Sequence, residues 1–361
     1  MNKQILSRAF AALLTLGLFA ACSERQEGDP KQAQGKKETQ QAAAKESKDV
    51  KVIKISHQFP GGTIEEGDFR DRLCRKFAQE VEKRTNGALK FEIYPANSLV
   101  KTNAQFSAMQ TGALDMTLLP LAYEGGKIPE VNLGLMPTLI TSYEQGLRWK
   151  DAPIGKELTK IVDKNGVKII TWVWQAGGVA SKGKPVIVPE DVQGVKIRGA
   201  SKEMDMMLKA AGGSITNIPS NEVYNGMQTG VLDAAVTSST SLISFRLHEV
   251  SKHVTTARDK TFWFMFEPLL MANSTFDKLT PEQQKIVMEV GASLEKFGME
   301  ESRKDDARLA EVYEKNGDRA YNIDEAAFAK WREVAKASAW KDFEEKVKNG
   351  KQLLEMAQSV Q

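Results

Sequence analysis

The spacing of hydrophobic residues along the chain switches between two periods, and this predicts an α/β fold. Residues 50–56 and 89–94 are β-rich runs in which apolar side chains alternate or follow one another directly. Between them, residues 66–85 carry apolar side chains at helical spacing, and Asn86-Gly87 is a helix stop signal. A strand, a helix and a strand in this order predict a parallel sheet with crossover helices.

The same periodicity predicts elements as far as residue 272. We expect helices at 97–111, 143–165, 202–211 and 220–228, and strands at 115–120, 167–174, 185–189, 195–198, 215–218, 232–236 and 261–272. The strand at 167–174 has the strongest pattern and is expected to end at Gln175-Ala176-Gly177-Gly178. The strand at 261–272 is expected to carry the chain back to its first part.

A long helix is expected next. Thr280-Pro281-Glu282-Gln283 is a capping box with proline at the first helical position, and the helical spacing continues to Asn316-Gly317. A helix of roughly 35 residues is about 50 Å long at 1.5 Å per residue. It could therefore run along two lobes, and Gly291 and Gly298 are where it could bend. Residues 324–361 predict further amphipathic helices.

One short segment occurs twice. Residues 109–115, Met-Gln-Thr-Gly-Ala-Leu-Asp, recur at 227–233, and the only change is from Ala113 to Val231. Each copy is typical of a helix end, a glycine C-cap and a buried strand. Two copies this far apart indicate two similarly built lobes, because a solenoid would repeat at a shorter period and more often. The cleft between such lobes is the natural binding site.

An arginine at a strand end is the main candidate for ligand binding. Pro189-Glu190-Asp191 and Gly194 predict a loop that leads into the short strand ending at Arg198. Open α/β sheets bind ligands at the carboxyl ends of their strands, and a guanidinium suits a carboxylate or sulfonate. A surface arginine with no ligand fits the pattern equally well. Hydroxyls at 237–241, including Thr237 and Ser238, could also face a ligand, although a helix cap is the favoured alternative.

The start of the chain has the features of a bacterial lipoprotein signal. The basic residues Lys3 and Arg8 precede an apolar run, residues 9–21, that ends just before Cys22. This run of about 13 residues is shorter than the roughly 20 needed to span a bilayer, so we expect cleavage and a lipid anchor on Cys22. Phe19 departs from the usual lipoprotein box, where leucine is commonest. Residues 23–49 lack core-forming side chains and predict a flexible tether.

Composition and motifs argue against several functions. The net charge is +3 with interspersed signs, which is unlike a nucleic-acid surface. His248 and His253 are off a common helical face, so no metal site is expected. Cys74 lies on the apolar stripe of its helix and predicts a buried structural thiol. The chain has no phosphate-binding glycine loop and no Gly-x-Ser-x-Gly motif. We therefore expect binding without catalysis and without a cofactor.

Three motifs together resemble the solute-binding proteins of tripartite ATP-independent periplasmic (TRAP) transporters, the C4-dicarboxylate-binding DctP family. They are residues 189–198 (Pro-Glu-Asp-Val-Gln-Gly-Val-Lys-Ile-Arg), 221–233 (Asn-Glu-Val-Tyr-Asn-Gly-Met-Gln-Thr-Gly-Val-Leu-Asp) and 279–284 (Leu-Thr-Pro-Glu-Gln-Gln). The resemblance implies a two-lobed periplasmic binding protein with hinge strands, a long helix spanning both lobes, and delivery of the ligand to a membrane permease. We expect a first lobe of 50–174 with 264–303 and a second of 175–263 with 304–361.

The resemblance also implies site residues. Arg198 matches the arginine that pairs with the ligand carboxylate, Thr237 and Ser238 match a polar position after the repeated strand, and His57 and Gln58 match a loop that lines the cleft. Trp174 falls at the hinge, Asn221 lies in the matched motif, and Tyr123 is a candidate for an aromatic wall.

The sequence departs from the family pattern at one place. Many members carry a second arginine just after the hinge, where this chain has residues 175–179, Gln-Ala-Gly-Gly-Val. This favours a monocarboxylate, or a less polar or aromatic organic acid, over a dicarboxylate. An ABC-type binding lipoprotein, a secreted enzyme on the same scaffold and a lipoprotein with a structural or chaperone role remain the alternatives.

Overall fold

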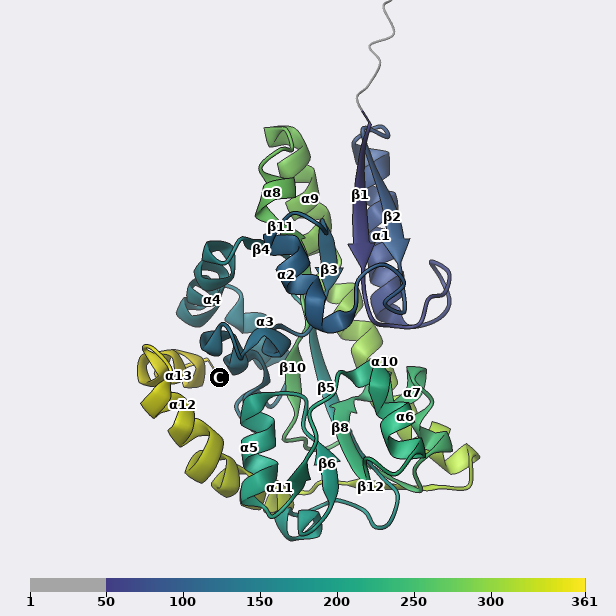
Figure 1. Ribbon diagram of the computed structural model, residues 1–361, viewed down its shortest axis with the longest axis vertical. Coiled ribbons are helices and arrows are strands. Elements are labelled where there is room, and N and C mark those ends of the chain that lie inside the picture. The colour runs from purple at the N-terminus through teal and green to yellow at the C-terminus, as the bar shows by residue number, and fades with distance from the viewer. Residues whose placement is uncertain (1–49, 361) are drawn as a thin grey trace, which may run out of the picture. The chain divides into compact units, whose positions relative to one another are not determined.

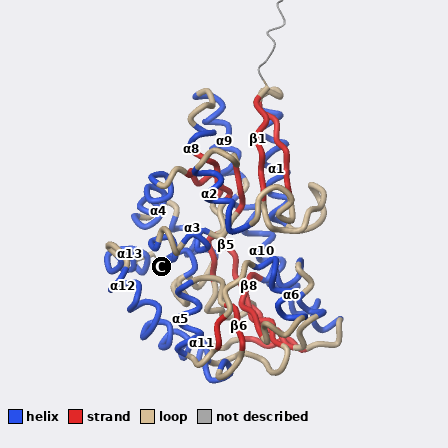
Figure 2. Tube along the Cα trace, in the orientation of Figure 1, coloured by secondary structure: helices blue, strands red, loops and turns tan. Residues whose placement is uncertain are grey.

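The computed structural model describes residues 50–360, which belong to one compact unit. The expected signal peptide, the tether and the lipid-bearing Cys22 lie outside the described residues. Between residues 50 and 360, no helix is both long enough and apolar enough to cross a membrane. Figure 2 shows the strands of this unit with helices packed around them, which is the expected α/β class.

Two sheets organise the chain (Figure 1). The first has the order β2-β1-β3-β11-β4, and we call it and its helices the first lobe. Its strands are β1 (Lys51–Ser56), β2 (Leu89–Tyr94), β3 (Met116–Leu118), β4 (Val167–Thr171) and β11 (Leu269–Ala272). Its helices are α1 (Phe69–Arg84), α2 (Gln105–Gln110), α3 (Tyr143–Trp149), α4 (Pro153–Lys164), α8 (Asn273–Phe276) and α9 (Pro281–Ser293).

The second sheet has the order β12-β9-β5-β8-β6-β7, with β10 paired to β5, and forms the second lobe. Its strands are β5 (Trp174–Ser181), β6 (Lys196–Arg198), β7 (Ser214–Ile215), β8 (Ala234–Ser238), β9 (His253–Thr256), β10 (Phe264–Phe266) and β12 (Arg319–Asn322). Its helices are α5 (Lys202–Ala210), α6 (Val223–Gln228), α7 (Ser239–Ser244) and α10 (Glu295–Lys315). The sequence did not predict β9 or β12.

The repeated segment has the same structure in both lobes. Each copy ends a helix, α2 or α6, and continues through a glycine with positive φ, 75° at Gly112 and 78° at Gly230. The aspartate that closes each copy accepts a backbone hydrogen bond from the neighbouring parallel strand. Asp115 accepts from Lys54 N at 2.9 Å, and Asp233 accepts from Lys196 N at 3.3 Å. The expectation of two similarly built lobes is therefore confirmed at the level of these units.

The chain crosses between the lobes at a place that differs from the expectation. The strand expected at 167–174 ends as β4 at Thr171, and a new strand, β5, begins at Trp174 and continues through the glycines expected to end it. Close packing explains these glycines. A Cβ on Gly177 would lie 2.5 Å from the Trp263 ring, and one on Gly178 would lie 1.8 Å from Thr255 O. Glycine therefore allows β5 to lie in the interior of the second sheet.

The returning connection is also divided. The single strand expected at 261–272 is two strands, β10 in the second sheet and β11 in the first. Glu267 and Pro268 lie between them. The pairs β4–β5 and β10–β11 thus each carry the chain from one sheet to the other, as hinge strands do.

The long helix is broken once. Thr280 caps α9 in the expected capping box, accepting from Gln283 N at 3.2 Å while Gln283 accepts from Thr280 N at 3.0 Å. The helix ends at Ser293, and α10 begins at Glu295. Gly291 packs so closely on β4 that a Cβ there would lie 2.3 Å from Ile170 O. Beyond the break, α10 contacts α1 of the first lobe and α7 and β5 of the second (Figure 1). The helix pair therefore spans both lobes as expected.

Two other expected elements differ. The helix expected at 143–165 is interrupted before Pro153, which takes the first position of α4. The strand expected at 185–189 does not form, because Pro189 opens a short 3₁₀ helix, Pro189–Val192, in its place. Of the two interpretations of 237–241, the helix cap is the observed one, since the Ser238 hydroxyl accepts from Ser241 N at 3.1 Å at the start of α7.

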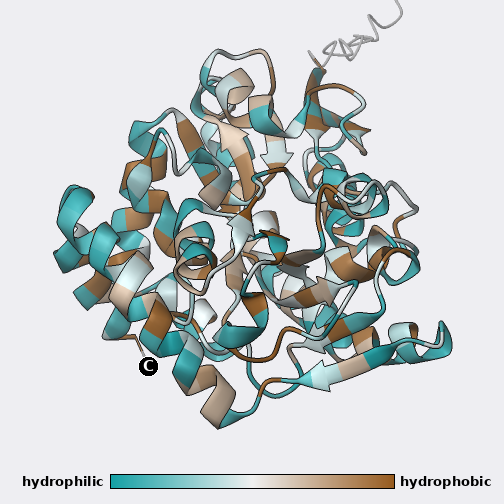
Figure 3. Cartoon of the chain, turned by 60° about the horizontal axis from the view of Figure 1, so that its bottom comes forward, coloured by the Kyte–Doolittle hydropathy of each residue, from teal (hydrophilic) through white to brown (hydrophobic). Residues whose placement is uncertain are grey.

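The C-terminal segment contains α11 (Glu325–Ala335), a π-helical turn (Lys336–Trp340), α12 (Lys341–Lys346) and α13 (Gly350–Gln358). Figure 3 shows hydrophilic and hydrophobic residues alternating along these helices, as expected for amphipathic packing. Trp331 Nε1 donates to Ile187 O at 2.8 Å, whereas α13 contacts α4 of the first lobe. The expected assignment of all of 304–361 to the second lobe therefore stays a prediction.

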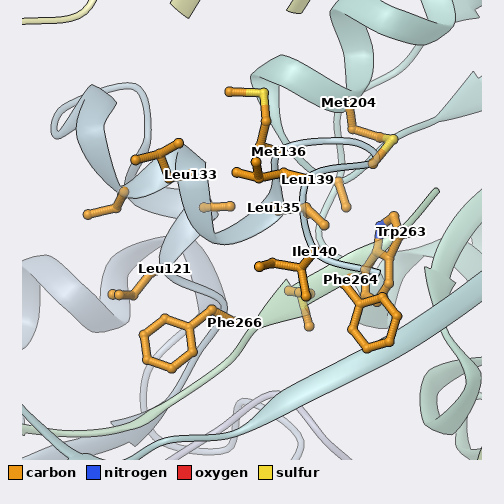
Figure 4. Packing of buried hydrophobic residues seen from close by; sticks show 14 of the residues in the cluster. Leu121, Leu133, Leu135, Met136, Leu139, Ile140, Met204, Trp263, Phe264 and Phe266 are labelled. Atoms are coloured by element: carbon orange, nitrogen blue, oxygen red, sulfur yellow. The ribbon is translucent and has the colours of Figure 1, made fainter. Parts of the chain in front are cut away.

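Apolar side chains also pack between the two lobes. Figure 4 shows residues of the 133–140 segment facing Met204 of α5 together with Trp263 and Phe264. Cys74 is buried in the α1 packing and forms no disulfide within residues 50–360, and burial raises the pKa of its thiol well above the ordinary value. The structural interpretation of Cys74 is thereby supported.

Candidate functional site

Arg198 ends β6 in the interior of the protein. Its side chain is 1% exposed, so the interpretation as a plain surface arginine is wrong. Nε donates to Ile218 O and Nη1 to Val236 O, both at 2.9 Å. Val236 lies in the middle of β8, and Ile218 lies in the loop that follows β7. Together the two carbonyls fix the plane of the guanidinium. Three of its five N–H groups have partners within residues 50–360, counting the bond to Tyr123 described next.

Tyr123 connects Arg198 to the first lobe. It lies in the 3₁₀ helix Leu121–Glu124, which follows β3. Its hydroxyl oxygen accepts from Arg198 Nη2 at 2.9 Å and from Ser220 N at 3.1 Å. Both donors belong to the second lobe, so one phenol oxygen joins two segments of the second lobe to the first.

A second polar contact between the lobes surrounds Thr102, which opens the 3₁₀ helix Thr102–Ala104. Its Oγ1 lies 3.4 Å from the amide of Gln58, which follows β1, and 3.3 Å from the amide of Asn221 in the second lobe. Asn221 directly follows Ser220. The polar groups of Gln58, Thr102, Asn221, Tyr123 and Arg198 therefore form a continuous set, which we call the interlobe seam.

Ser238 belongs to a third cluster, which is centred on Arg70. Arg70 lies in the first turn of α1, is 1% exposed, and pairs with Asp68 at 2.7 Å and with Glu267 at 3.4 Å. Its Nη1 also donates to Ser241 Oγ at 3.0 Å and to Ser238 Oγ at 3.5 Å. Arg70 thereby connects α1 of the first lobe, the returning hinge connection and α7 of the second lobe.

The carboxyl group of Glu267 has a strongly raised pKa. Burial raises its pKa to about 7, and the charge of Arg70 opposes this rise without cancelling it. Gln175, the first residue after Trp174 in β5, donates its amide N–H to Glu267 Oε2. Many family members carry a second arginine in this part of the chain. Here Gln175 lies beside the buried carboxyl group of Glu267 and is hydrogen-bonded to it.

Two of the expected residues support the structure around the site. His57 is fully buried, and its Nε2 lies 3.2 Å from Asp71 Oδ1. Burial raises the pKa of Asp71, but hydrogen bonds from His57 and Arg75 outweigh it, so the net shift is downward. Trp174 packs with ring centroids 5.3 Å from Trp149 and 5.1 Å from Phe266. Neither residue is brought into contact with Arg198.

Thr237 lies at the end of β8, where it follows Val236, the residue whose carbonyl holds Arg198. It pairs with Gly178 of β5 and is 3% exposed. No residue within the described range engages its hydroxyl. Thr237 therefore offers a hydroxyl without a partner in this range, one residue beyond the carbonyl that holds Arg198.

The sequence analysis missed Arg70, Thr102 and Glu267. Arg70 could have been found, because it shares a helical face with Cys74, Phe77 and Val81. A charged residue on the apolar stripe of a helix predicts a buried ion pair. Glu267 could have been found in the same way, because it is the one charged residue in the apolar run 262–272, whereas no local signal distinguishes Thr102.

Comparison with known proteins agrees with this architecture. The model of the bacterial extracellular solute-binding proteins, family 7 (DctP), matches residues 63–346. A solute-binding protein of Albidiferax ferrireducens is 58% identical over 309 residues, which are 86% of this chain and 91% of that protein.

Solved structures give the same result. A TRAP periplasmic solute-binding protein from Rhodoferax ferrireducens with bound malonate matches with a TM-score of 0.84 at 57% identity, over 85% of this chain and 98% of that one. A TRAP periplasmic solute-binding protein from Sulfurospirillum deleyianum with bound succinate matches with a TM-score of 0.76 at 21% identity, over 86% and 99%. The second likeness shows the fold alone.

Proposed function

Because the chain belongs to the DctP family of bacterial extracellular solute-binding proteins, we propose that it captures a small organic acid between its two lobes through Arg198. It then passes the acid to the membrane permease of a TRAP transporter. The observation that carries the role of Arg198 is its lack of an ion pair. Within the described residues no carboxylate lies within 4.0 Å of this guanidinium, although its side chain is only 1% exposed.

A buried and unpaired cation is costly, so the site favours an anion. Asp205 interacts electrostatically with Arg198, since burial raises the pKa of Asp205 to about 6 while the charge of Arg198 lowers it. Asp205 Oδ1 accepts from Gly199 N at 3.0 Å and not from Arg198. Two carbonyls and a phenol oxygen hold the guanidinium in a fixed plane, which reduces the entropy lost when a carboxylate binds.

The ligand is a small carboxylate. The structure of the relative from Rhodoferax ferrireducens has bound malonate, a dicarboxylate, so malonate is one of the acids to test on this chain. This differs from the preference for a monocarboxylate that the missing second arginine suggested. Gln175 supplies no second positive charge, because it is neutral and donates to Glu267. Both classes of acid therefore belong in the test.

The expected site residues divide into two roles in this proposal. Gln58, Tyr123 and Asn221 of the interlobe seam, together with Thr237, offer polar groups to the ligand. The other three, His57, Trp174 and Ser238, position the loops and the hinge, since their contacts are with protein.

The remaining parts of the proposal concern location and chemistry. We infer that the protein works in the periplasm, held to a membrane by a lipid on Cys22, and that residues 23–49 give it reach. No catalysis and no cofactor are part of the proposal. A group of three or more potential metal ligands does not occur among residues 50–360.

Isothermal titration of the purified protein, unfolded and refolded to remove captured ligand, tests the anion role. We expect binding of one or more acids, and loss of at least tenfold in affinity in Arg198→Ala with an unchanged far-UV spectrum. Arg319→Ala, which removes an exposed arginine on β12, is the matched control. Equal affinity of wild type and Arg198→Ala would remove Arg198 from the mechanism.

A further inference from the structure

The Thr102 hydroxyl has three amide neighbours but only one proton to donate to them. Three amide groups lie within hydrogen-bonding distance of its Oγ1, those of Asn97 at 3.0 Å, Asn221 at 3.3 Å and Gln58 at 3.4 Å. A hydroxyl has one proton to donate and two lone pairs that accept. Only one of the three amides can therefore present its oxygen to Thr102, and the other two must present their NH₂ groups.

Gln105 decides which amide presents its oxygen. One amide atom of Gln105 lies 3.0 Å from Val100 O, which can only accept, so this atom is the nitrogen. Gln105 Oε1 is then free to accept from the Thr117 hydroxyl at 2.7 Å. The same Gln105 nitrogen lies 3.3 Å from the amide of Asn97 and donates to it. Asn97 therefore presents its oxygen, and it is also the nearest of the three amides to Thr102.

The orientation of Gln58 follows from this. Thr102 donates its proton to Asn97, so its lone pairs face Gln58 and Asn221, and both must turn their NH₂ groups toward it. Amide oxygen and nitrogen are assigned from such networks, because they have nearly the same shape. The other amide atom of Gln58 is then the carbonyl oxygen. Gln58 is 1% exposed. The structure assigns the atom that faces Thr102 as Oε1 and the other as Nε2, which has no partner among the described residues. The network above exchanges these two atoms, so the atom without a partner is the oxygen.

We propose that the Gln58 carbonyl oxygen accepts a hydrogen bond from the ligand, and that the ligand therefore carries an O–H or N–H donor in addition to its carboxylate. This inference rests on the proposed function. A buried acceptor without a partner costs about 1–3 kcal/mol, and a ligand donor removes this cost. The simplest ligands of this class are hydroxy acids.

The position of Gln58 supports this assignment. It directly follows His57 at the carboxyl end of β1, the edge of a parallel sheet where ligands bind. Through Thr102 it is joined to Asn221, and the adjacent Ser220 is joined through Tyr123 to Arg198. The acceptor and the anion-binding guanidinium thus belong to the same interlobe seam, one on each lobe.

Matched ligands separate a donor requirement from a general preference for acids. We would measure dissociation constants for the hydroxy, oxo and unsubstituted forms of one skeleton, lactate, pyruvate and propionate, and for tartronate and malonate. A hydroxyl can donate, whereas an oxo group can only accept. We expect each hydroxy acid to bind at least tenfold more tightly than its partners, because a site built around a polar group discriminates strongly against ligands that lack it. Tighter binding of pyruvate than of lactate, or equal binding of tartronate and malonate, would overturn the proposal.

Variants connect the preference to Gln58. Gln58→Met keeps the length of the side chain but removes the acceptor, and we expect the hydroxy and unsubstituted acids to bind it equally. Thr102→Val removes the group that orients the amide, so the ratio of the affinities for the hydroxy and unsubstituted acids should shrink. Gln110→Met changes an exposed glutamine on α2 and should keep the full preference. A preference that survives in Gln58→Met overturns the inference, whereas failure of every acid to bind wild type would overturn the proposed function itself.

Discussion

Arg198 of the second lobe donates to the hydroxyl of Tyr123 in the first lobe at 2.9 Å, and the same hydroxyl accepts from Ser220 N. The phenol oxygen therefore completes the support of the guanidinium from the opposite side of the interlobe seam. It also leaves the phenolic proton available, because both of these bonds use the oxygen as acceptor.

Replacing Tyr123 by phenylalanine should weaken acid binding without unfolding the protein. The change removes one acceptor from the charged Arg198 and one from Ser220 N, and the neutral bond to Ser220 N alone contributes about 0.5–1.5 kcal/mol. We expect roughly a threefold to tenfold loss of affinity by calorimetry. Tyr94→Phe is the matched control, because that hydroxyl bonds only to the exposed Glu92. Tyr123→Phe with the affinity of wild type would show that the contact is incidental.

Glu267 should make stability depend on pH. Its pKa is about 7 in the folded protein, whereas an unfolded glutamate titrates near 4.3. Between these values the native state binds more protons than the unfolded state, so the free energy of unfolding falls as pH rises and the loss is complete above pH 7. Protonated Glu267 therefore stabilises the fold at low pH relative to neutral pH.

Glu267→Gln tests this dependence. It should reduce the pH slope of the unfolding free energy by up to about 1.4 kcal/mol per pH unit between pH 5 and 7, measured by denaturant titration. Glu300→Gln changes an exposed carboxylate, 51% exposed, and should leave the slope unchanged. Because burial also raises the pKa of Glu203 and Asp306 to about 7, a residual slope of the same sign should remain. Identical slopes in wild type and Glu267→Gln would refute the prediction.

Gly178 should be intolerant of any side chain. A Cβ there would meet Thr255 O at 1.8 Å, inside the sheet and against backbone that cannot move aside. Overpacking of this kind costs about 1–3 kcal/mol, so Gly178→Ala should lower Tm by several degrees. A Cβ on Gly183 meets nothing within 4 Å, so Gly183→Ala is the control. Equal melting temperatures of the two variants would mean that β5 adjusts its position freely.

The repeated aspartates should differ in their contribution to stability. Asp115 accepts from Lys54 N at 2.9 Å and from Thr275 Oγ1 at 2.6 Å, while Asp233 accepts from Lys196 N at 3.3 Å. Each hydrogen bond to a charged group contributes about 1.5–3 kcal/mol. Asp115→Ala should therefore destabilise the protein more than Asp233→Ala in denaturant unfolding, with each variant serving as the control of the other. The reverse order would contradict the geometric argument.

The local pattern of the chain was enough to determine several elements of the fold. The capping box at Thr280, the glycine stops of the repeated segments and the strand that ends at Arg198 all depend on residues close together in sequence. Hydrophobic period, cap chemistry and glycine conformation act over a few residues, so they can be recognised without the fold. The repeat further indicated two lobes, because both copies encode the same helix, turn and strand.

Only the tertiary structure decided how the lobes are joined and which polar groups meet. The crossing from β4 to β5 depends on Trp263 and Thr255 lying against Gly177 and Gly178, and these contacts join distant parts of the chain. Likewise, Arg70 meets Ser241, and Thr102 meets Asn221, across the two lobes. The orientation of the Gln58 amide depends on a network whose members come from four separate segments. Hydrogen-bond partners of this kind are chosen by packing in three dimensions, and no local period in the sequence records them.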